Sequence, residues 1–105
     1  MISCVVDYEI DPLKIEAFEE FARHWMRLVD AHGGRHHGYF LPAEGASDRA
    51  LAVFSFESLA AYENYRELFE IDPDFVAADR IRDESGCVRR YLRTFMRPLL
   101  PGGAR

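Results

Sequence analysis

Three of the four histidines of this chain lie in one short stretch, HGGRHHGYFLPAEGA, which spans residues 32–46. Neutral imidazole is the commonest metal ligand in proteins, and histidine is also a frequent general acid or base near neutral pH. The stretch therefore suggests two kinds of chemistry, a metal site and a proton-transfer site. The spacing of the histidines decides between these and a structural role.

The spacing argues against a metal site. His36 and His37 are consecutive in a predicted strand, so their side chains are expected on opposite faces and could bind one metal only across a bulge. His32 and His36 are four residues apart, but Gly33-Gly34 interrupts the helical register between them. Glu44, the nearest carboxylate, stands beyond the end of the strand. We therefore expect no metal and no cofactor, and we interpret His32 as a structural residue near a helix C-terminus, where a cation is favourable.

Arg66 is a charged residue inside a predicted apolar stripe. At 100° per residue it lies about 40° around its helix from Tyr62. A guanidinium that leaves water is costly unless it finds an acceptor. That acceptor is either an acidic residue of the first strand, such as Asp7 or Glu9, or an anionic group of a bound ligand.

Aromatic side chains near Arg66 would complete a pocket for a small molecule. Two tyrosines share its helix, and His37 and Tyr39 are expected on one face of the strand over residues 35–41. Gly38 in the middle of that strand leaves room for a ligand or another backbone. Aromatic walls with one charged group are a common pocket composition. The expected ligand is a small anionic or carbonyl-bearing molecule, and the candidate pocket residues are His37, Tyr39, Tyr62, Tyr65 and Arg66.

The elements that would position these residues alternate between strand and helix. Period-two alternation predicts strands over residues 2–10, 35–41, 50–57 and 87–97, and helical periodicity predicts helices over residues 12–32, 59–70 and 73–84. Asp11, Ser58 and Asp72 are suitable N-caps for the three helices. Gly33-Gly34 ends the first helix by permitting a left-handed C-cap.

This β-α-β-β-α-(α)-β order predicts an α+β fold, a ferredoxin-like βαββαβ antiparallel sheet with its helices on one face. The strands carry apolar residues on both faces, and the helices can cover only one. A second copy of the sheet is the simplest cover for the other face, so we expect a homodimer. Arg89, Arg93 and Arg97 are expected on one face of the last strand, as a solvated or interface strip.

Composition excludes several classes of protein. The 105 residues, 49% hydrophobic with a net charge of −5, predict one domain over residues 1–98 and a flexible tail over residues 99–105. An acidic chain is not expected to bind nucleic acid, and no apolar run approaches the roughly 20 residues that span a bilayer. The N-terminus has no signal-peptide pattern. The two cysteines form no CxxC motif, so we expect a cytoplasmic protein without an internal disulfide.

Longer segments of the chain resemble the NIPSNAP family. The resemblance rests on GGRHHGYFLPAEGASDRALAVFSFESLAAYENYR, on the DPDF that follows, and on RTFMRPLL near the end, so it covers nearly the whole chain. It implies the dimeric α+β barrel fold. The family has no agreed catalytic residues to transfer, and the FMRP near the end departs mildly from its pattern. The matching positions are His36, His37, Gly38, Tyr39, Phe40, Glu44, Gly45, Tyr62, Tyr65 and Arg66.

Three functions agree with these observations. The first is a homodimeric protein that binds a small molecule. The second is a cofactor-independent enzyme of the monooxygenase or isomerase type, in which a histidine or tyrosine transfers a proton. The third is a structural interaction module without a ligand. A pocket between sheet and helices that contains His37 or Arg66 would favour the first two, and a solid apolar core would favour the third.

Overall fold

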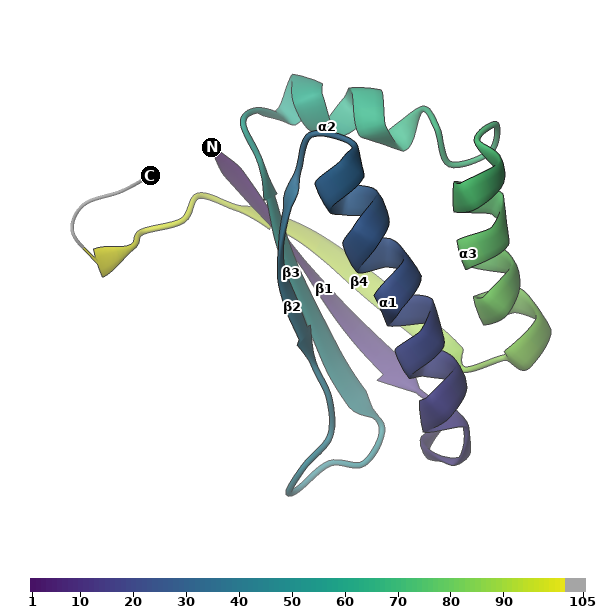
Figure 1. Cartoon of the computed structure of the whole chain (residues 1–105). Helices are drawn as coiled ribbons and strands as arrows, with labels where there is room; N and C mark the ends of the chain where they lie inside the picture. The colour runs from purple at the N-terminus through teal and green to yellow at the C-terminus, as the bar shows by residue number, and fades with distance from the viewer. Residues whose placement is uncertain (102–105) are drawn as a thin grey trace.

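The computed structural model describes residues 1–101, which form four strands, a short 3₁₀ turn and three helices (Figure 1). The α+β fold predicted from the sequence is confirmed. Part of the expected tail, residues 102–105, lies outside the described residues. In chain order the elements are β1 (Ile2–Ile10), η1 (Pro12–Lys14), α1 (Ile15–Ala31), β2 (Arg35–Phe40), β3 (Arg49–Phe56), α2 (Leu59–Arg66), α3 (Pro73–Ser85) and β4 (Val88–Met96).

The four strands form one antiparallel sheet in the order β2-β3-β1-β4. This order is that of the ferredoxin-like fold, with the first and third strands at the centre. Figure 1 shows α1 and α3 on the same side of the sheet, with α2 across one end. The sheet thus has one face toward the helices and one face without them.

All three residues predicted as N-caps accept a backbone hydrogen bond. Ser58 and Asp72 cap α2 and α3, whereas Asp11 caps the 3₁₀ turn η1 and α1 begins after it without a side-chain cap. Asp11 and Ser58 accept hydrogen bonds from the backbone N–H groups of Leu13, at 3.0 Å, and of Ala61, at 3.1 Å. Asp72 accepts one from the N–H of Asp74 at 2.9 Å. These bonds satisfy amide groups that have no partner inside the first helical turn.

The second helix is shorter than its sequence predicts. The pattern extends to residue 70, but α2 ends at Arg66 and the chain continues in turns. The N–H groups of Leu68 and Phe69 bond to carbonyls three residues earlier, which tightens the backbone beyond α-helical geometry. The tighter path places the Phe69 ring 5.0 Å from the ring of Trp25 on α1. Packing against the core therefore overrides helical propensity here.

The core lies between the sheet and α1, and it is rich in aromatic rings. Phe18 and Phe75 are fully buried, and Ile10 and Ala52 contribute from the sheet. The residues of β1 and β3 that point to this side alternate with residues that point away. This alternation gives each of the two strands one face in the core.

The face of the sheet without helices carries exposed apolar side chains. Leu92 and Met96 on β4 are 64% and 53% exposed, and Phe40 on β2 is 57% exposed. Val5 and Val53 pair at the centre of this face and are half-buried. A face of this composition is typical of a surface that another layer covers.

A β-bulge in β2 exchanges the faces that sequence alternation predicts for its histidines. His36 pairs with Phe54 and Gly38 with Val53, so His37 is an extra residue without a partner on β3. An extra residue reverses the alternation beyond it, and His36 therefore shares the helix face with Tyr39. His37 lies on the opposite face, where its Nε2 is 2.8 Å from the Ser55 hydroxyl. The expectation that His37 and Tyr39 share a face is wrong for this reason.

The bulge depends on glycine at position 38. Gly38 has φ of +117°, a region that side chains with a Cβ rarely adopt, although no heavy atom lies within 4 Å of the position of an added Cβ. We expect Gly38→Ala to lower the free energy of unfolding by about 1–3 kcal/mol through backbone strain. Urea denaturation measures this change. Synthetic protein with D-alanine at position 38 should keep wild-type stability, and an L-alanine variant as stable as wild type would contradict the strained geometry.

Candidate functional site

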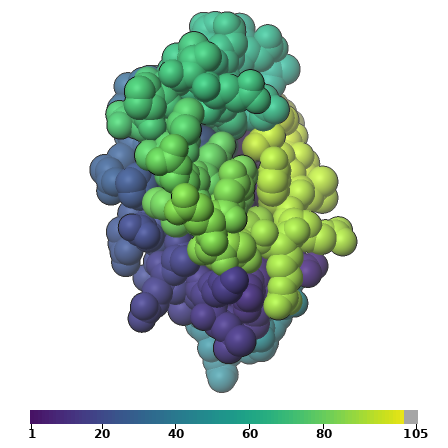
Figure 2. Space-filling view, turned by 90° about the vertical axis from the view of Figure 1, so that its right-hand side faces the viewer, coloured from purple at the N-terminus to yellow at the C-terminus, as the bar shows by residue number. Residues whose placement is uncertain are grey.

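A cavity of about 420 Å³ lies between the sheet and all three helices. Its lining residues come from β1, β2, β3, β4, α1 and α3, and from α2 with the turn that follows it. The cavity exists because α3 packs chiefly against α1 rather than against β4, which leaves the helix face of β4 partly open. Figure 2 shows the side of the molecule where α3, in green, lies beside β4, in yellow.

Aromatic rings form most of the cavity wall. All five tyrosines of the chain line it, together with the only tryptophan. The Tyr65 ring lies near the centre of this group, 6.4 Å from Trp25, 5.9 Å from Tyr62 and 6.3 Å from Phe54 between ring centroids. The aromatic lining residues are Tyr8, Phe21, Trp25, Tyr39, Phe54, Tyr62, Tyr65, Phe69 and Tyr91.

The structure brings four of the five candidate pocket residues to this cavity. Tyr39, Tyr62 and Tyr65 line its wall, and Arg66 stands at its rim. His37 does not line it, because the β2 bulge turns this side chain to the other face of the sheet. His36 takes the place that alternation gives to His37. The mid-strand glycine that would reveal the exchange is present in the sequence, but a glycine alone does not fix the position of a bulge.

Arg66 is exposed rather than buried. Its guanidinium lies over the Phe69 ring, 5.4 Å from the centroid. No carboxylate among residues 1–101 lies within ion-pair distance of it, and Asp7 is paired with Arg49 at 3.3 Å instead. The predicted choice between a salt bridge and a buried ligand anchor therefore rests on a wrong premise, because the helix ends at Arg66 and its side chain reaches the rim.

Arg93 is the cation that reaches deeper into the cavity. It lies on the helix face of β4, opposite Val6, and it is half-buried beside the Tyr91 ring at 5.4 Å. No carboxylate within the described part of the chain forms an ion pair with it. The expectation of a solvated or interface strip is wrong for Arg93, because its face of β4 borders the cavity beneath the helices.

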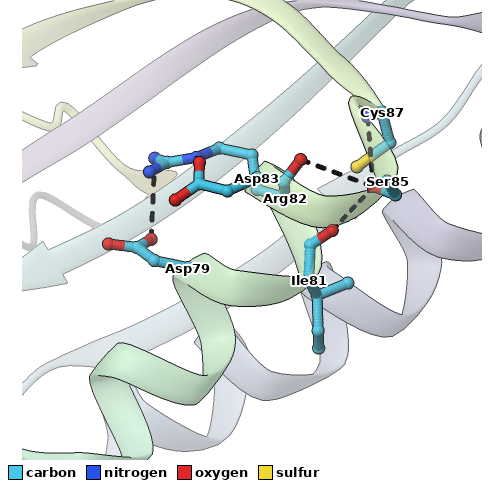
Figure 3. Close-up of polar contacts among 6 residues, drawn as sticks. All are labelled: Asp79, Ile81, Arg82, Asp83, Ser85 and Cys87. Carbon is cyan, nitrogen blue, oxygen red and sulfur yellow. Dashed lines mark hydrogen bonds and ion pairs between the residues drawn. The ribbon is translucent and has the colours of Figure 1, made fainter.

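On α3, a third arginine of the cavity lining, Arg82, forms an ion pair with Asp79. Asp79 and Arg82 lie 3.5 Å apart, and Arg82 also contacts Asp83 at 3.0 Å. Figure 3 shows the Arg82 guanidinium beside Asp79. Burial raises the pKa of Asp79, and Arg82 opposes this shift. With Glu67 and Glu70 at the rim, the lining holds three arginines and three carboxylates, so its formal charge balances.

The end of α3 is fixed by hydrogen bonds close to this pair. The Ser85 hydroxyl donates to the carbonyl of Ile81 at 2.6 Å and accepts from the N–H of Cys87 at 3.1 Å (Figure 3). Gly86 adopts φ of +68° and ends the helix. This local network orients the last turn of α3, which carries Arg82.

Three buried polar atoms of the cavity wall have no hydrogen-bond partner among residues 1–101. These atoms are Nε1 of Trp25, Nε2 of His36 and the hydroxyl oxygen of Tyr62. Trp25 and Tyr62 are only 8% and 5% exposed. An unpaired buried polar group costs about 1–3 kcal/mol, so three of them in one cavity are a substantial cost for a small domain.

The hydrogen bonding of His36 fixes its tautomer. The Gly38 N–H donates to Nδ1 of His36 at 2.9 Å, so Nδ1 carries the lone pair and Nε2 carries the proton in the neutral ring. Burial lowers the pKa of His36 to about 4. The imidazole stacks on Tyr39, with centroids 5.1 Å apart and an interplanar angle of 8°. His36 is therefore a neutral hydrogen-bond donor at physiological pH.

Three tyrosines of the cavity, Tyr8, Tyr39 and Tyr65, are kept neutral for a similar reason. Burial raises the pKa of Tyr8 to about 12, and burial also raises the pKa values of Tyr39 and Tyr65. A phenol with a raised pKa is a poor base and a ready hydrogen-bond donor. The polar groups of the wall are thus chiefly neutral donors.

The described residues show no group suited to metal chemistry. Within residues 1–101, no three histidine, cysteine or acidic side chains are grouped as metal ligands would be. Cys4 and Cys87 are both buried and unpaired, and burial raises the pKa of Cys4 to about 11, so its thiol stays protonated. No helix in the same residues is long and apolar enough to cross a membrane.

Comparisons with known proteins give a family and a fold. The NIPSNAP family model matches residues 5–100. A NIPSNAP family protein of unknown function from Agrobacterium tumefaciens has 18% identity and a TM-score of 0.78, with 93% of this chain and 87% of that chain covered. An uncharacterized NIPSNAP domain protein from Burkholderia xenovorans has 17% identity and a TM-score of 0.74, with 93% and 94% covered.

A further solved structure extends the fold comparison beyond NIPSNAP proteins. A "putative antibiotic biosynthesis monooxygenase" from Nitrosomonas europaea has 13% identity and a TM-score of 0.73, with 95% of this chain and all of that chain covered. At such identities the likeness concerns the fold alone. No curated protein matches the chain.

The low pKa of His36 predicts a specific acid sensitivity. Between its ordinary pKa of 6.5 and the folded value of about 4, the unfolded chain binds a proton that the folded chain does not. The stabilising contribution of neutral His36 is thus complete above pH 6.5 and is lost as the pH falls toward 4. Urea unfolding at pH 7 and pH 5 should show a smaller loss for His36→Leu than for wild type. His37→Leu, on the opposite face, is the control and should behave as wild type. Equal losses in all three proteins would contradict this assignment.

Proposed function

The chain belongs to the NIPSNAP family, and from this premise we propose that it is a homodimeric cytoplasmic protein that binds a small molecule with an anionic or carbonyl group. The single observation that carries the proposal is the cavity, whose aromatic wall contains unpaired polar groups. Ligand pockets commonly combine an apolar lining with a few polar groups that orient the ligand. The two unpaired cysteines support a reducing compartment.

The position of the charged groups supports an anionic or carbonyl ligand. Arg93 is half-buried, has no ion pair within the described residues, and borders the rings of Tyr91 and Tyr8. A guanidinium in such a place can bind a carboxylate through two parallel hydrogen bonds, or a carbonyl oxygen through one. Arg66 at the rim can attract an anion but is too exposed to fix its orientation.

The exposed sheet face supports the homodimer. Leu92, Met96 and Phe40 project from it, and Val5 and Val53 form its centre. A face-to-face contact with a second copy would bury these side chains, and about 1,600 Å² of total buried surface is typical of a stable interface. In that arrangement the cavity, on the other side of the sheet, stays open.

The cavity favours ligand binding over the two other functions suggested by the sequence. A structural module would gain stability from a solid core at this place, whereas the unpaired groups lower stability. An enzyme that uses histidine or tyrosine as a base finds little support, because Nε2 of His36 already carries the proton and burial raises the tyrosine pKa values. The monooxygenase relative shares only the fold, so it does not change this order.

The homodimer predicts that a charge on the open sheet face separates the subunits. We expect wild-type protein to scatter light as a species of about twice the 12.1 kDa chain mass at micromolar concentration, and Leu92→Lys to scatter as the single chain. Leu13→Lys is the matched control, because Leu13 is 92% exposed on η1, away from this face. A wild-type protein that remains a single chain at these concentrations would end the dimer proposal.

The ligand proposal is tested with 1-indanone and naphthalene-2-carboxylate, one carbonyl and one anionic probe. Each should raise the melting temperature, and each should shift the single indole N–H resonance, which comes from Trp25 in the cavity wall. Arg93→Leu should weaken binding of the carboxylate about tenfold or more, the loss of a charged hydrogen bond. Arg90→Leu, on the other face of the same strand, is the control and should leave binding unchanged. If neither probe causes either change in wild-type protein, the cavity is not a site for this class of ligand.

A further inference from the structure

The three unpaired polar groups of the cavity share one chemical property. The Trp25 indole N–H is only a donor, and His36 presents Nε2–H because its Nδ1 is bonded to the Gly38 N–H. The Tyr62 hydroxyl can donate as well. No buried side-chain acceptor of the cavity, among the described residues, is left unpaired apart from this hydroxyl. The wall therefore complements a ligand that offers acceptors.

We infer that Trp25, His36 and Tyr62 select an uncharged carbonyl oxygen carried on a flat aromatic skeleton. This inference rests on the proposed function and names the ligand class for the same cavity. These three side chains distinguish a carbonyl from other groups by hydrogen bonding. Arg93 allows an anionic group to bind but does not make the cavity prefer one.

The charge of the wall favours a neutral carbonyl over a carboxylate. The indole N–H has no charge and burial keeps His36 neutral, and the arginines and carboxylates of the lining balance in formal charge. A carboxylate would lose its hydration among aromatic rings. It would gain only Arg93 as a half-buried cation without an ion pair among the described residues, because Arg82 is already paired with Asp79 and Asp83. A ketone loses much less on leaving water, and its two lone pairs can accept two of the three donors. An ammonium group would meet N–H groups that cannot accept from it.

The arrangement of rings favours a flat ligand. The rings of Trp25 and Tyr62 lie 6.4 and 5.9 Å from the Tyr65 ring, and His36 is joined to the same group through Phe54, 5.5 Å away. The rings that carry the three donors thus belong to one aromatic cluster around Tyr65 and Phe54. A planar ligand can stack on these rings or meet them edge to face while its oxygen reaches a donor. The volume of about 420 Å³ lies within the range of pockets for small molecules.

The test compares 1-indanone with indane, which has the same bicyclic skeleton but no carbonyl, and with 1-aminoindane, by nuclear magnetic resonance titration of the full chain. We expect 1-indanone to bind about tenfold more tightly than indane, and 1-aminoindane to bind more weakly than both. The Trp25 indole N–H resonance should move downfield with the ketone and not with the hydrocarbon. Because the carbonyl oxygen can accept two of the three donors, at least two of the variants Trp25→Phe, Tyr62→Phe and His36→Phe should each reduce the preference for the ketone about threefold, which is within the range for the loss of one hydrogen bond.

Folding of the variants is monitored through their melting temperatures without ligand. Tyr62→Phe keeps its ring and removes only an unpaired hydroxyl, so it should melt no lower than wild type. Trp25→Phe also removes part of a buried indole, so it should melt lower than wild type but still unfold in one transition. His37→Phe is the control for His36→Phe, because the adjacent residue faces away from the cavity, and it should leave the preference unchanged.

Two results would overturn this inference and leave ligand binding intact. They are equal binding of 1-indanone and indane, as expected if water satisfies the donors when ligand is bound, and an unchanged preference in all three variants. Tighter binding of naphthalene-2-carboxylate than of 1-indanone, lost in Arg93→Leu, would instead assign recognition to the arginine. Absence of binding by every probe would remove the proposed function and this inference together.

Discussion

The structure depends on one constraint, which is that its helices cover only part of one face of a sheet that is apolar on both. The third helix packs chiefly against α1, so the helix face of β4 keeps Tyr91, Arg93 and Phe95 partly exposed. The resulting gap is the cavity. On the other face Leu92 and Met96 meet no helix. The cavity and the uncovered apolar face, for which we propose a ligand and a second subunit, are thus on opposite sides of the same sheet, and both follow from incomplete coverage by helices.

The bulge in β2 links backbone geometry to the chemistry of the cavity. One extra residue brings His36 rather than His37 to the helix face. The N–H of Gly38 then donates a hydrogen bond to the imidazole nitrogen Nδ1 of His36. That bond and the burial of the ring keep His36 neutral with a proton on Nε2. A single backbone irregularity therefore determines which histidine lines the cavity, which of its nitrogens carries the proton, and that this nitrogen donates rather than accepts.

The buried unpaired donors lower the free energy of unfolding. A domain of about 100 residues is stable by only about 5–15 kcal/mol, and each buried unpaired group costs about 1–3 kcal/mol of this. Such local conflicts between polarity and burial are expected at functional sites. Because the solved relatives share under 20% of their residues with this chain, they establish the fold and not the chemistry of the cavity. That chemistry follows from the residues of this chain.

The sequence by itself determined the elements, their order and the fold, because hydrophobic period and capping residues act over a few neighbouring positions. Period and caps correctly indicated β1, α1, β3 and β4, and they indicated Tyr39, Tyr62 and Tyr65 as residues that come together. Only the tertiary structure decided the exchange of His36 and His37, the end of α2 at Arg66, and the place of Arg93 in a cavity wall. Each of these depends on contacts between segments distant in sequence: the register of β2 on β3, the packing of Phe69 on Trp25, and the packing of α3 on α1 rather than β4. Local pattern carries no information about such contacts, since the same alternation and periodicity are compatible with either arrangement.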